Sequence, residues 1–489
     1  MSASSLALSR RAFLSTTATL GGAMVLGAPF RAALASTPLL KVESRTLEVN
    51  KKAAKVYGVV HSSGKHGLMA REGDRFNGAI LNASDQPLQM HWHGQMLAPA
   101  DQDRARPGGG TLAIGESDTH DFVLTPGTHW MHSHSLTEQQ LLAAPMIARE
   151  RDAGDVQDVV IMLHDFAFRS PQEILAELGG TSSHAGHINP PAASKDPAPK
   201  STGMQHGPGM MMPGMPGHAM RMPHANDVRY DAYLANDRTL DDPEVVTVEK
   251  GGRVRLRIIN GGTATAFFVS TPGLPSRCIA VDGAPCNSIE ASRYPMAQGQ
   301  RIDLLLEIPR EGGSFPIIAH VEGATAQTGI ILTTAGAAIR KVASSAAKAE
   351  ALLDLSFESQ LAATVPLSAK KADKSFMMLL GEEPGYRWTI NGRVHGEHTP
   401  IDVRQNERVE ITFMNPTSMM HPMHLHGHHF QIVGIGGRRY SGPLRDTVIV
   451  PAHAPVTIAF DAKLKGAWFM HCHHLYHMAT GMMTEVRIS

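Results

Sequence analysis

At 489 residues, the chain is long enough for about three domains of the usual size, roughly 150 residues each. Its hydrophobic content of 42% and charged content of 18% are those of an ordinary globular protein. Lysine plus arginine balances aspartate plus glutamate at 45 each, so no basic surplus favours a nucleic acid as partner. Histidine, with 27 residues, and methionine, with 26, are unusually abundant, and both side chains bind transition metals.

The first 35 residues are typical of an export signal. Arg10-Arg11 precedes Phe13 and a weakly apolar stretch of glycine, alanine and threonine, which ends at Ala33-Leu34-Ala35. This order favours a twin-arginine signal peptide over residues 1–35, cleaved after Ala35, rather than a Sec signal or an ordinary basic start. No other segment reaches the roughly 18 consecutive apolar residues of a membrane span. We therefore expect a soluble protein of the bacterial periplasm.

Internal repeats predict three copies of one β-sandwich unit. Asn236-Asp237-Arg238 leads to Asn260, and Asn391-Gly392-Arg393 leads to Asn415, with 24 residues from the first asparagine to the last in both copies (260 − 236 and 415 − 391). Each copy ends in an alternating apolar strand, and a partial copy ends at Asn82. The predicted all-β domains span residues 40–168, 227–340 and 372–489.

Two short histidine motifs lie in the first of these domains. They are His91-Trp92-His93 and His132-Ser133-His134. Alternate side chains of a strand share one face, so each motif can present two imidazoles to the same metal site. Either motif alone is explained equally well by coincidence, and the other clusters of the chain decide between the two interpretations.

A helix start and a methionine-rich insertion occupy residues 169–226. Ser170, Pro171 and Glu173 have the spacing of a capping box, which predicts a helix running to Gly179. The remainder is rich in proline and glycine, a composition that argues against fixed structure. A plain linker does not need so many thioethers, which are soft ligands that select Cu(I). We expect transient Cu(I) binding by Met204, Met210, Met211, Met212, Met215, Met220 and Met222.

The second domain carries no histidine motif, and we expect it to act as a spacer. Cys278 and Cys286 flank the hairpin-turn dipeptide Asp282-Gly283, so they can face each other across two strands. They form either a disulfide, which an oxidising periplasm permits, or two buried thiols. The alanine-rich segment 335–352 is either a short helix or part of a linker, which we place at residues 341–371.

The third domain holds the two densest clusters. The first runs His421-Pro422-Met423-His424-Leu425-His426, directly after Met419-Met420, and the second runs His471-Cys472-His473, ahead of His477 and Met482. On a strand, Cys472 faces one way and both neighbouring histidines face the other. The cysteine then lies covalently between two metal sites, which is what an electron relay needs. Each of the four clusters supplies ligands that the others lack.

In these motifs the chain resembles the multicopper oxidases, a family that includes laccases, bilirubin oxidases and bacterial cuprous oxidases. The resemblance covers nearly all of the chain after the signal, and it implies three cupredoxin-like Greek-key domains and four copper ions. By this resemblance, the ligands of type 1 copper are His421, Cys472 and His477, with Met482 as the weak axial ligand. Those of type 2 copper are His91 and His424. Those of the type 3 pair are His93, His132 and His473 on one ion, and His134, His426 and His471 on the other.

The resemblance also implies a reaction. A reductant gives up electrons one at a time at type 1 copper, Cys472 with His471 and His473 carries them, and O₂ is reduced to water at a three-copper cluster between the first and third domains. Asp103 best fits the family acid that supplies protons, although the gap after His-Trp-His-Gly is one residue longer than expected; the alternative is a surface carboxylate. Many relatives carry a second acid directly after the second type 1 histidine, where this chain has Met478.

The insertion, the export signal, the stretch Glu138-Gln139-Gln140 and the closing stretch 473–478 all resemble the copper-resistance branch, whose members oxidise Cu(I). We therefore predict a monomeric cuprous oxidase in which Met419 and Met420 pass electrons into the type 1 site, unless these residues only pack at a strand end. The alternatives are a general laccase-like phenol oxidase and, from another class, a non-catalytic copper-sequestering protein. A two-domain nitrite reductase fits less well, because those proteins lack the paired type 3 histidines.

Overall fold

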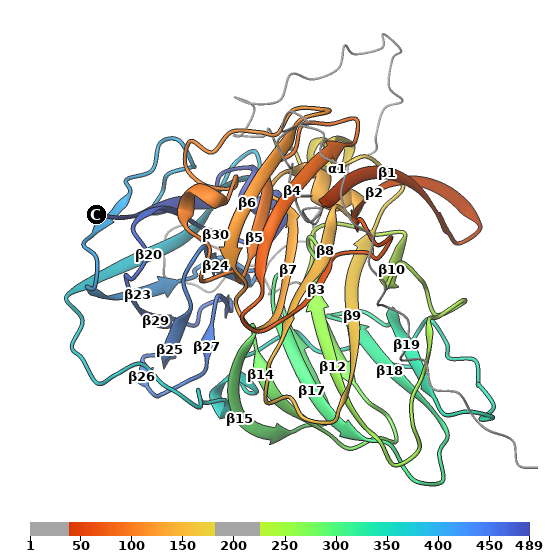
Figure 1. The fold of residues 1–489 in the computed structure, drawn as a ribbon. Helices are drawn as coiled ribbons and strands as arrows, with labels where there is room; N and C mark the ends of the chain where they lie inside the picture. Colours follow the sequence, from red (N-terminus) through yellow and green to blue (C-terminus); the bar gives the residue numbers. More distant parts are fainter. Residues whose placement is uncertain (1–38, 181–224) are drawn as a thin grey trace, which may run out of the picture. The chain divides into compact units, whose positions relative to one another are not determined.

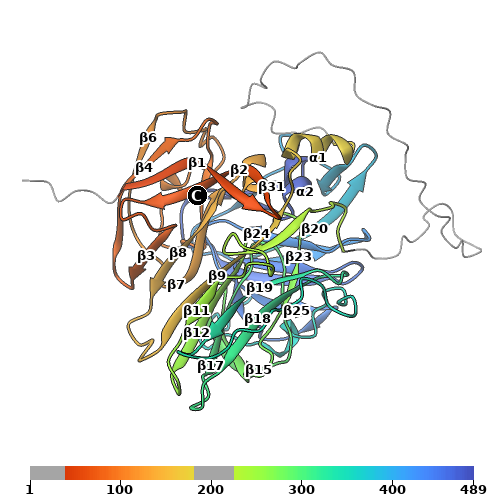
Figure 2. The ribbon, with the colours of Figure 1, turned by 90° about the vertical axis from the view of Figure 1, so that its right-hand side faces the viewer.

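The computed structural model of the protein describes residues 39–180 and 225–489. The predicted signal peptide and the methionines between positions 204 and 222 lie outside these residues. The described chain is built mainly of β-strands, which form three pairs of sheets, and its helices are short (Figures 1 and 2). The prediction of an all-β fold with three cupredoxin-like sandwiches is confirmed.

The first sandwich precedes the insertion. Its strands are β1 (Leu39–Val49), β2 (Lys52–His61), β3 (Leu68–Arg71), β4 (Arg75–Ala83), β5 (Met90–His93), β6 (Ser117–Val123), β7 (Gly127–Ser133) and β8 (Ala143–Arg149). One sheet has the order β2-β1-β4-β6 and the other β3-β8-β7-β5. Apolar residues of both sheets, such as Val42, Phe76 and Met131, form one buried core. Strand β5 buries Met90 and Trp92 in this core, so His91 and His93 point to the opposite face of the strand.

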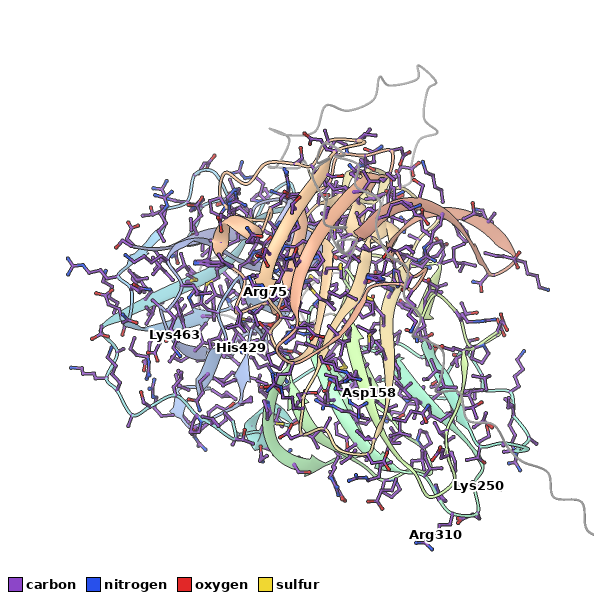
Figure 3. All side chains as sticks on the ribbon, in the orientation of Figure 1. Arg75, Asp158, Lys250, Arg310, His429 and Lys463 are labelled. Atoms are coloured by element: carbon purple, nitrogen blue, oxygen red, sulfur yellow. The ribbon has the colours of Figure 1, made fainter. Side chains whose placement is uncertain are left out.

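The second sandwich spans the insertion. Its strands are β9 (Gln157–Phe166), β10 (Ala232–Ala235), β11 (Val245–Thr247), β12 (Arg253–Asn260), β13 (Phe267–Ser270), β14 (Ser276–Val281), β15 (Ala284–Glu290), β16 (Tyr294–Met296), β17 (Arg301–Glu307), β18 (Ser314–Val321) and β19 (Gln327–Thr333). The sheets have the orders β10-β9-β12-β17-β14-β15 and β11-β19-β18-β13-β16. Exposed Lys250 and Arg310 project from the loops at one end (Figure 3).

Strand β9 differs from the predicted domain division, which places residues 157–166 in the first domain. It pairs in parallel with β12 and antiparallel with β10, so it belongs to a sheet of the second sandwich. The physical reason is that Val159, Ile161 and Leu163 bury their side chains in the second core. An alternating apolar strand is recognisable in sequence, but the sheet that receives it depends on tertiary packing.

The third sandwich contains the remaining strands. They are β20 (Lys374–Glu383), β21 (Arg387–Ile390), β22 (Ile401–Val403), β23 (Arg408–Met414), β24 (His421–Leu425), β25 (Phe430–Ile435), β26 (Arg438–Arg439), β27 (Leu444–Arg445), β28 (Thr447–Val450), β29 (Val456–Asp461), β30 (Gly466–Cys472) and β31 (Met483–Ile488). One sheet has the order β21-β20-β23-β29-β25-β26, with β27 paired to β25, and the other β22-β31-β30-β24-β28. Strands β24 and β30 carry the two densest clusters side by side.

The repeated asparagine has the same structural role in all three sandwiches. Its side-chain oxygen accepts a hydrogen bond from the backbone two residues later. Its amide donates to one carbonyl in the loop that follows and to one on a facing segment. The Asn82 amide donates to the carbonyls of Gln86 and Leu112, the Asn260 amide to those of Thr265 and Met296, and the Asn415 amide to those of Met419 and Val450. In the third sandwich this bond ties down the loop directly before His421.

The predicted capping box is present and begins the helix α1 (Pro171–Glu177), which ends two residues before Gly179. The Ser170 side chain accepts from the Glu173 amide, and the Glu173 side chain accepts from the Ser170 amide. A second helix, α2 (Leu475–Ala479), is not predicted from the sequence. Three short 3₁₀ helices cover Ala100–Gln102 (η1), Leu136–Gln140 (η2) and Glu358–Gln360 (η3). Residues 335–352 contain no helix, so the linker interpretation is the correct one.

Cys278 and Cys286 are two buried thiols in the structure. They lie on β14 and β15, joined by the turn at Asp282-Gly283, where both residues have a positive φ as this hairpin turn requires. The two sulfur atoms are 3.8 Å apart, so the strands bring the thiols together as expected without a bond between them.

Glu322 should make the stability of the second sandwich depend on pH. Its side chain is buried and accepts a hydrogen bond from the Leu353 amide at 2.6 Å, and burial raises its pKa to about 7. The folded state therefore favours the protonated Glu322 carboxyl. The contribution to the free energy of unfolding that is fully present below pH ~4.5 is lost as the pH rises through 7. Glu322→Gln should therefore raise stability at pH 8.5 by on the order of 2–3 kcal/mol but have little effect at pH 4.5. Denaturant titrations at both pH values, with exposed Glu311→Gln as control, test this; equal pH profiles for wild type and Glu322→Gln would contradict it.

Candidate copper sites

Three ligands predicted for type 1 copper converge in the third sandwich. His421 begins β24, Cys472 ends the neighbouring strand β30, and His477 lies on α2, which folds back over the end of β30. The Cys472 sulfur lies 3.7 Å from Nδ1 of each histidine, and the two Nδ1 atoms are 3.2 Å apart. All three side chains are fully buried. Two imidazoles and one thiol can therefore share a single ion here.

The surroundings hold these ligands in place. Nε2 of His421 lies 2.9 Å from the Thr417 hydroxyl, which leaves Nδ1 for the metal, and the ring of Trp388 stacks on His477 with centroids 3.8 Å apart. Met482 is fully buried, and its carbonyl accepts a hydrogen bond from the Cys472 amide at 3.0 Å. Helix α1 packs against α2 through a shared apolar cluster, so it supports the helix that carries His477 (Figure 2).

The remaining histidines meet where the first and third sandwiches touch. Nε2 of His91 lies 3.2 Å from Nε2 of His424. Nε2 of His471 lies 3.1 Å from that of His134 and 3.0 Å from that of His426. Some of these contacts join residues more than 300 positions apart in the chain, as between His134 and His471, where the separation is 337. The interface predicted to hold the cluster is therefore where the histidines gather.

A third group forms around His93. Its Nδ1 lies 3.4 Å from Nε2 of His132, and the ring of His473 lies 5.1 Å from both rings. Both nitrogens of His473 are buried and have no hydrogen-bond partner among the described residues. A buried imidazole without a partner is costly, and a metal ion would satisfy it. Because His473 follows the last residue of β30, it leaves the strand and reaches the group around His93.

The donor set fits copper. Burial, followed by repulsion from neighbouring imidazoles, lowers the pKa of six of these histidines well below 6.5: His91, His93, His421, His424, His426 and His473. They are neutral, as metal ligands must be. Lone pairs that face one another at about 3 Å repel unless a cation lies between them. Burial also raises the pKa of the Cys472 thiol, so a thiolate here requires a bound metal ion.

Oxygen atoms orient the cluster histidines through their second ring nitrogen. The pairs are His91 Nδ1 with Asp103 Oδ2 (2.6 Å), His132 Nδ1 with Glu138 Oε2 (3.1 Å), His93 Nε2 with Asp446 Oδ1 (3.0 Å), His424 Nδ1 with the Asp446 carbonyl (2.8 Å) and His426 Nδ1 with the Ala105 carbonyl (2.9 Å). Such contacts decide which nitrogen faces the metal. Asp103 is thus buried beside a predicted type 2 ligand and is not a surface carboxylate.

The three carboxyl groups differ in their electrostatics. Burial raises the pKa of Asp103 to about 8 and raises that of Glu138 as well. Burial also acts to raise the pKa of Asp446, but the Arg301 guanidinium outweighs it and holds that pKa below its usual value. The sequence motifs assign no site role to Glu138 or Asp446. Asp446 follows Arg445 directly before the apolar strand β28, and this charged pair beside an apolar strand is the only local signal for it.

A cavity of about 240 Å³ reaches the cluster from the border of the first and third sandwiches. Its walls include Arg106, Gly109, Phe469 and His134, a predicted ligand of the cluster. Met478, which stands where many relatives carry an acid, also lines it. The thioether therefore makes this wall of the cavity apolar near the cluster.

Asp227, directly after the insertion, lies at the outer edge of the type 1 group. Its carboxylate is 3.7 Å from Nε2 of His477 and 3.3 Å from Nε2 of His474, and it accepts a hydrogen bond from the Tyr386 hydroxyl. Burial acts to raise its pKa, but the two imidazoles outweigh burial and hold the pKa well below the usual value. Its side chain is 15% exposed, so this edge is accessible to a small reductant. The sequence carries no signal for this residue.

Met419 and Met420 directly precede His421 in the chain. Met419 is buried in the third core, in agreement with strand-end packing, whereas Met420 is only partly buried against that core. Only Met420 is therefore placed to meet a reductant from outside.

Three β-sandwiches, a His₂Cys group in the third and a histidine cluster shared by the first and third define a copper-dependent oxidoreductase. The multicopper oxidase family matches residues 41–152, 194–342 and 369–489, and the chain belongs to that family. None of the described helices is long and apolar enough to cross a membrane.

Relatives of the chain include proteins named multicopper oxidase, copper resistance protein and laccase. The chain is 29% identical to multicopper oxidase MmcO of Mycobacterium tuberculosis, covering 86% of this chain and 80% of the relative. It is 23% identical to copper resistance protein A of Escherichia coli, over 86% and 87% of the two chains. The laccase of Botrytis aclada superposes with a TM-score of 0.71 at 21% identity, over 92% of this chain and 87% of that one, which supports the fold alone.

Proposed function

We propose that this multicopper oxidase oxidises Cu(I), and with it small phenols, at the type 1 site and reduces O₂ to water at the cluster, and that it serves copper tolerance in the periplasm after twin-arginine export. It would hold four copper ions on the predicted ligands. The observation that carries the proposal is the division of neighbours on β30: Cys472 joins His421 and His477, while His471 joins His134 and His426. One peptide bond thus links an electron-accepting site to an oxygen-reducing one.

The chain's residues set the path of the electrons, and the reduction of O₂ to water sets the stoichiometry. Copper, when bound, supplies the one-electron redox chemistry. Electrons that enter at Cys472 have a covalent route to His471 and His473, and the His471 Nδ1 atom lies 2.9 Å from the Cys472 carbonyl, which adds a hydrogen-bonded route. One O₂ takes up four electrons and four protons to give two waters, so four Cu(I) ions become four Cu(II). The cavity beside His134 is the proposed route for O₂.

Asp227 supports Cu(I) as the reductant, because a carboxylate beside a type 1 ligand attracts a cation more than a neutral phenol. Asp227→Asn should lower kcat/KM for Cu(I) by about tenfold or more, on the order of 1–2 kcal/mol, and change the value for a neutral phenol much less. Steady-state O₂ uptake measures both. Asp231→Asn, on the exposed side of the same segment, is the matched control. An equal loss on both reductants would mean that Asp227 serves the site in general and does not select a cation.

A laccase-like phenol oxidase is the second candidate, supported by relatives named laccase. A copper-sequestering protein is the third. The deciding experiment measures O₂ uptake by the copper-loaded protein with Cu(I) and with a simple phenol. Higher kcat/KM on Cu(I) supports the cuprous oxidase, higher kcat/KM on the phenol supports the laccase, and no uptake with either supports sequestration. A variant lacking residues 183–222 keeps Asp227 and shows whether the insertion lowers the Cu(I) concentration needed.

A further inference from the structure

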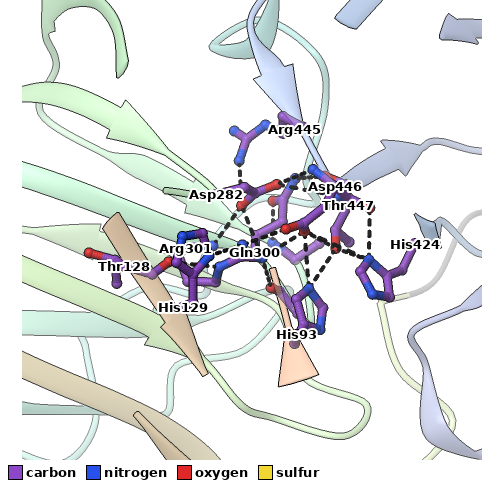
Figure 4. Close-up of polar contacts among 12 residues, drawn as sticks. His93, Thr128, His129, Asp282, Gln300, Arg301, His424, Arg445, Asp446 and Thr447 are labelled. Carbon is purple, nitrogen blue, oxygen red and sulfur yellow. Dashed lines mark hydrogen bonds and ion pairs between the residues drawn. The ribbon is translucent and has the colours of Figure 1, made fainter. Parts of the chain in front are cut away.

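A buried polar network reaches the cluster from the second sandwich, which contributes none of the predicted copper ligands (Figure 4). Its centre is Asp446, between β27 and β28 of the third sandwich. The Asp446 side chain accepts a hydrogen bond from Nε2 of His93 at 3.0 Å, and its carbonyl accepts one from Nδ1 of His424 at 2.8 Å. One residue therefore orients two histidines that are predicted to bind different copper ions.

The contact with His93 decides which nitrogen that ring presents. Nε2 faces Asp446 and, at 3.4 Å, the Thr447 hydroxyl, so Nε2 carries the hydrogen. Nδ1 is left to face His132 and the cluster. His91, His134, His424, His426 and His471 instead present Nε2 to one another. His93 thus depends on its oxygen partner for the opposite ring orientation.

Asp446 is held in turn by Arg301, the first residue of β17 in the second sandwich. The guanidinium contacts both carboxylate oxygens, Nη1 to Oδ1 at 2.7 Å and Nη2 to Oδ2 at 2.5 Å, and both side chains are fully buried. A planar two-pronged contact fixes orientation as well as charge. Arg301 also donates to the Thr128 carbonyl of the first sandwich and to the Gly299 carbonyl. It therefore ties all three sandwiches together behind the cluster.

The loop before Arg301 also touches the cluster. Gly299 has a φ of +80°, and a Cβ built on it would lie 2.7 Å from Cδ2 of His473. Gln300 donates to the Thr447 carbonyl at 3.0 Å. The segment 299–301 therefore forms a wall against one predicted type 3 ligand while its arginine orients the partner of another.

We propose that Arg301 is a positioning residue for the copper cluster: through Asp446 it holds His93 and His424 in their binding orientation, and the second sandwich is thereby part of the site rather than a spacer. The inference rests on the proposed copper cluster. Lysine at this position keeps the positive charge but cannot make the planar, two-pronged contact of a guanidinium, so it should not orient Asp446.

The test compares copper loading in Arg301→Lys and Arg257→Lys. Arg257 is the matched control because it lies in the same sandwich, is equally buried and pairs with Asp158, Glu150 and Asp303 rather than with Asp446. Copper per protein, the blue type 1 absorption, the type 2 electron paramagnetic resonance signal and affinity in chelator competition are the readouts. Arg301→Lys should keep the blue band but bind cluster copper about 10–100-fold more weakly, whereas Arg257→Lys should lose only thermal stability.

Wild-type affinity and an unchanged type 2 signal in folded Arg301→Lys would overturn the proposal, as would an equal loss in Arg257→Lys. If Arg301→Lys does not fold, Asp446→Asn keeps a side-chain oxygen but not the ion pair. The same selective loss of cluster copper then supports the proposal, and normal loading overturns it. A wild-type protein that binds no cluster copper would instead refute the proposed function, so the two failures are distinguishable.

Discussion

Replacing Cys472 with serine should abolish the blue absorption of the copper-loaded protein and reduce its O₂ uptake to background with every reductant. The sulfur lies 3.7 Å from Nδ1 of both predicted type 1 histidines, His421 and His477, and Cys472 is the one residue of this group whose chain neighbours lie in the histidine cluster. A serine hydroxyl is a hard, weakly acidic ligand that does not replace a thiolate. Without the sulfur, the electron-accepting site and its route to His471 are lost together.

The same substitution should leave the fold intact. Serine is nearly the same size as cysteine, and the sulfur sits among buried polar imidazoles, so the metal-free protein should lose only about 1 kcal/mol. Circular dichroism and the unfolding midpoint of the metal-free protein check this. Cys278→Ser is the matched control, because Cys278 is equally buried but lies in the second sandwich. A Cys472→Ser protein that stays blue would refute the type 1 assignment.

Replacing Asp103 should slow O₂ reduction, and two variants separate its possible contributions. Asp103→Asn keeps an oxygen that can accept from Nδ1 of His91, 2.6 Å away in the native protein, but it cannot deliver a proton. A group that supplies protons to a reaction contributes roughly 10²–10⁴-fold, so Asp103→Asn should retain copper and lose turnover by about that factor. Asp103→Ala also removes the contact with His91 and should bind type 2 copper about 10–100-fold more weakly.

Turnover under saturating reductant and copper content measure these effects. Asp101→Asn, two residues earlier and exposed, should match the wild type in both. Normal turnover in Asp103→Asn would assign the proton supply to another group. Glu138 is then the next candidate, because it is buried against His132 and burial raises its pKa, whereas Arg301 holds the pKa of Asp446 below its usual value.

Much of the site follows from local spacing. The clusters lie on strands or at their ends, where alternation decides the facing of each side chain, so the motif alone assigns Cys472 and His471 to different sites. The repeated asparagines are recognisable for a similar reason, because Asn82, Asn260 and Asn415 close the same turn in each unit. The capping box at Ser170 is likewise a short-range pattern. The short helix α2 lacks such a signal, since His474 supplies no side-chain cap.

Local patterns in the sequence predict the ligand types, their grouping along the chain and the all-β class, since each depends on residues a few positions apart. Tertiary structure alone decided that β9 joins the second sandwich, that Asp227 lies beside His477, and that Asp446 and Arg301 support His93. Contacts of this kind join residues that are remote in the chain, as with Arg301 and Asp446. They form because a buried charge needs a partner and a buried imidazole needs an oxygen, and which partner is within reach depends on how the sandwiches pack.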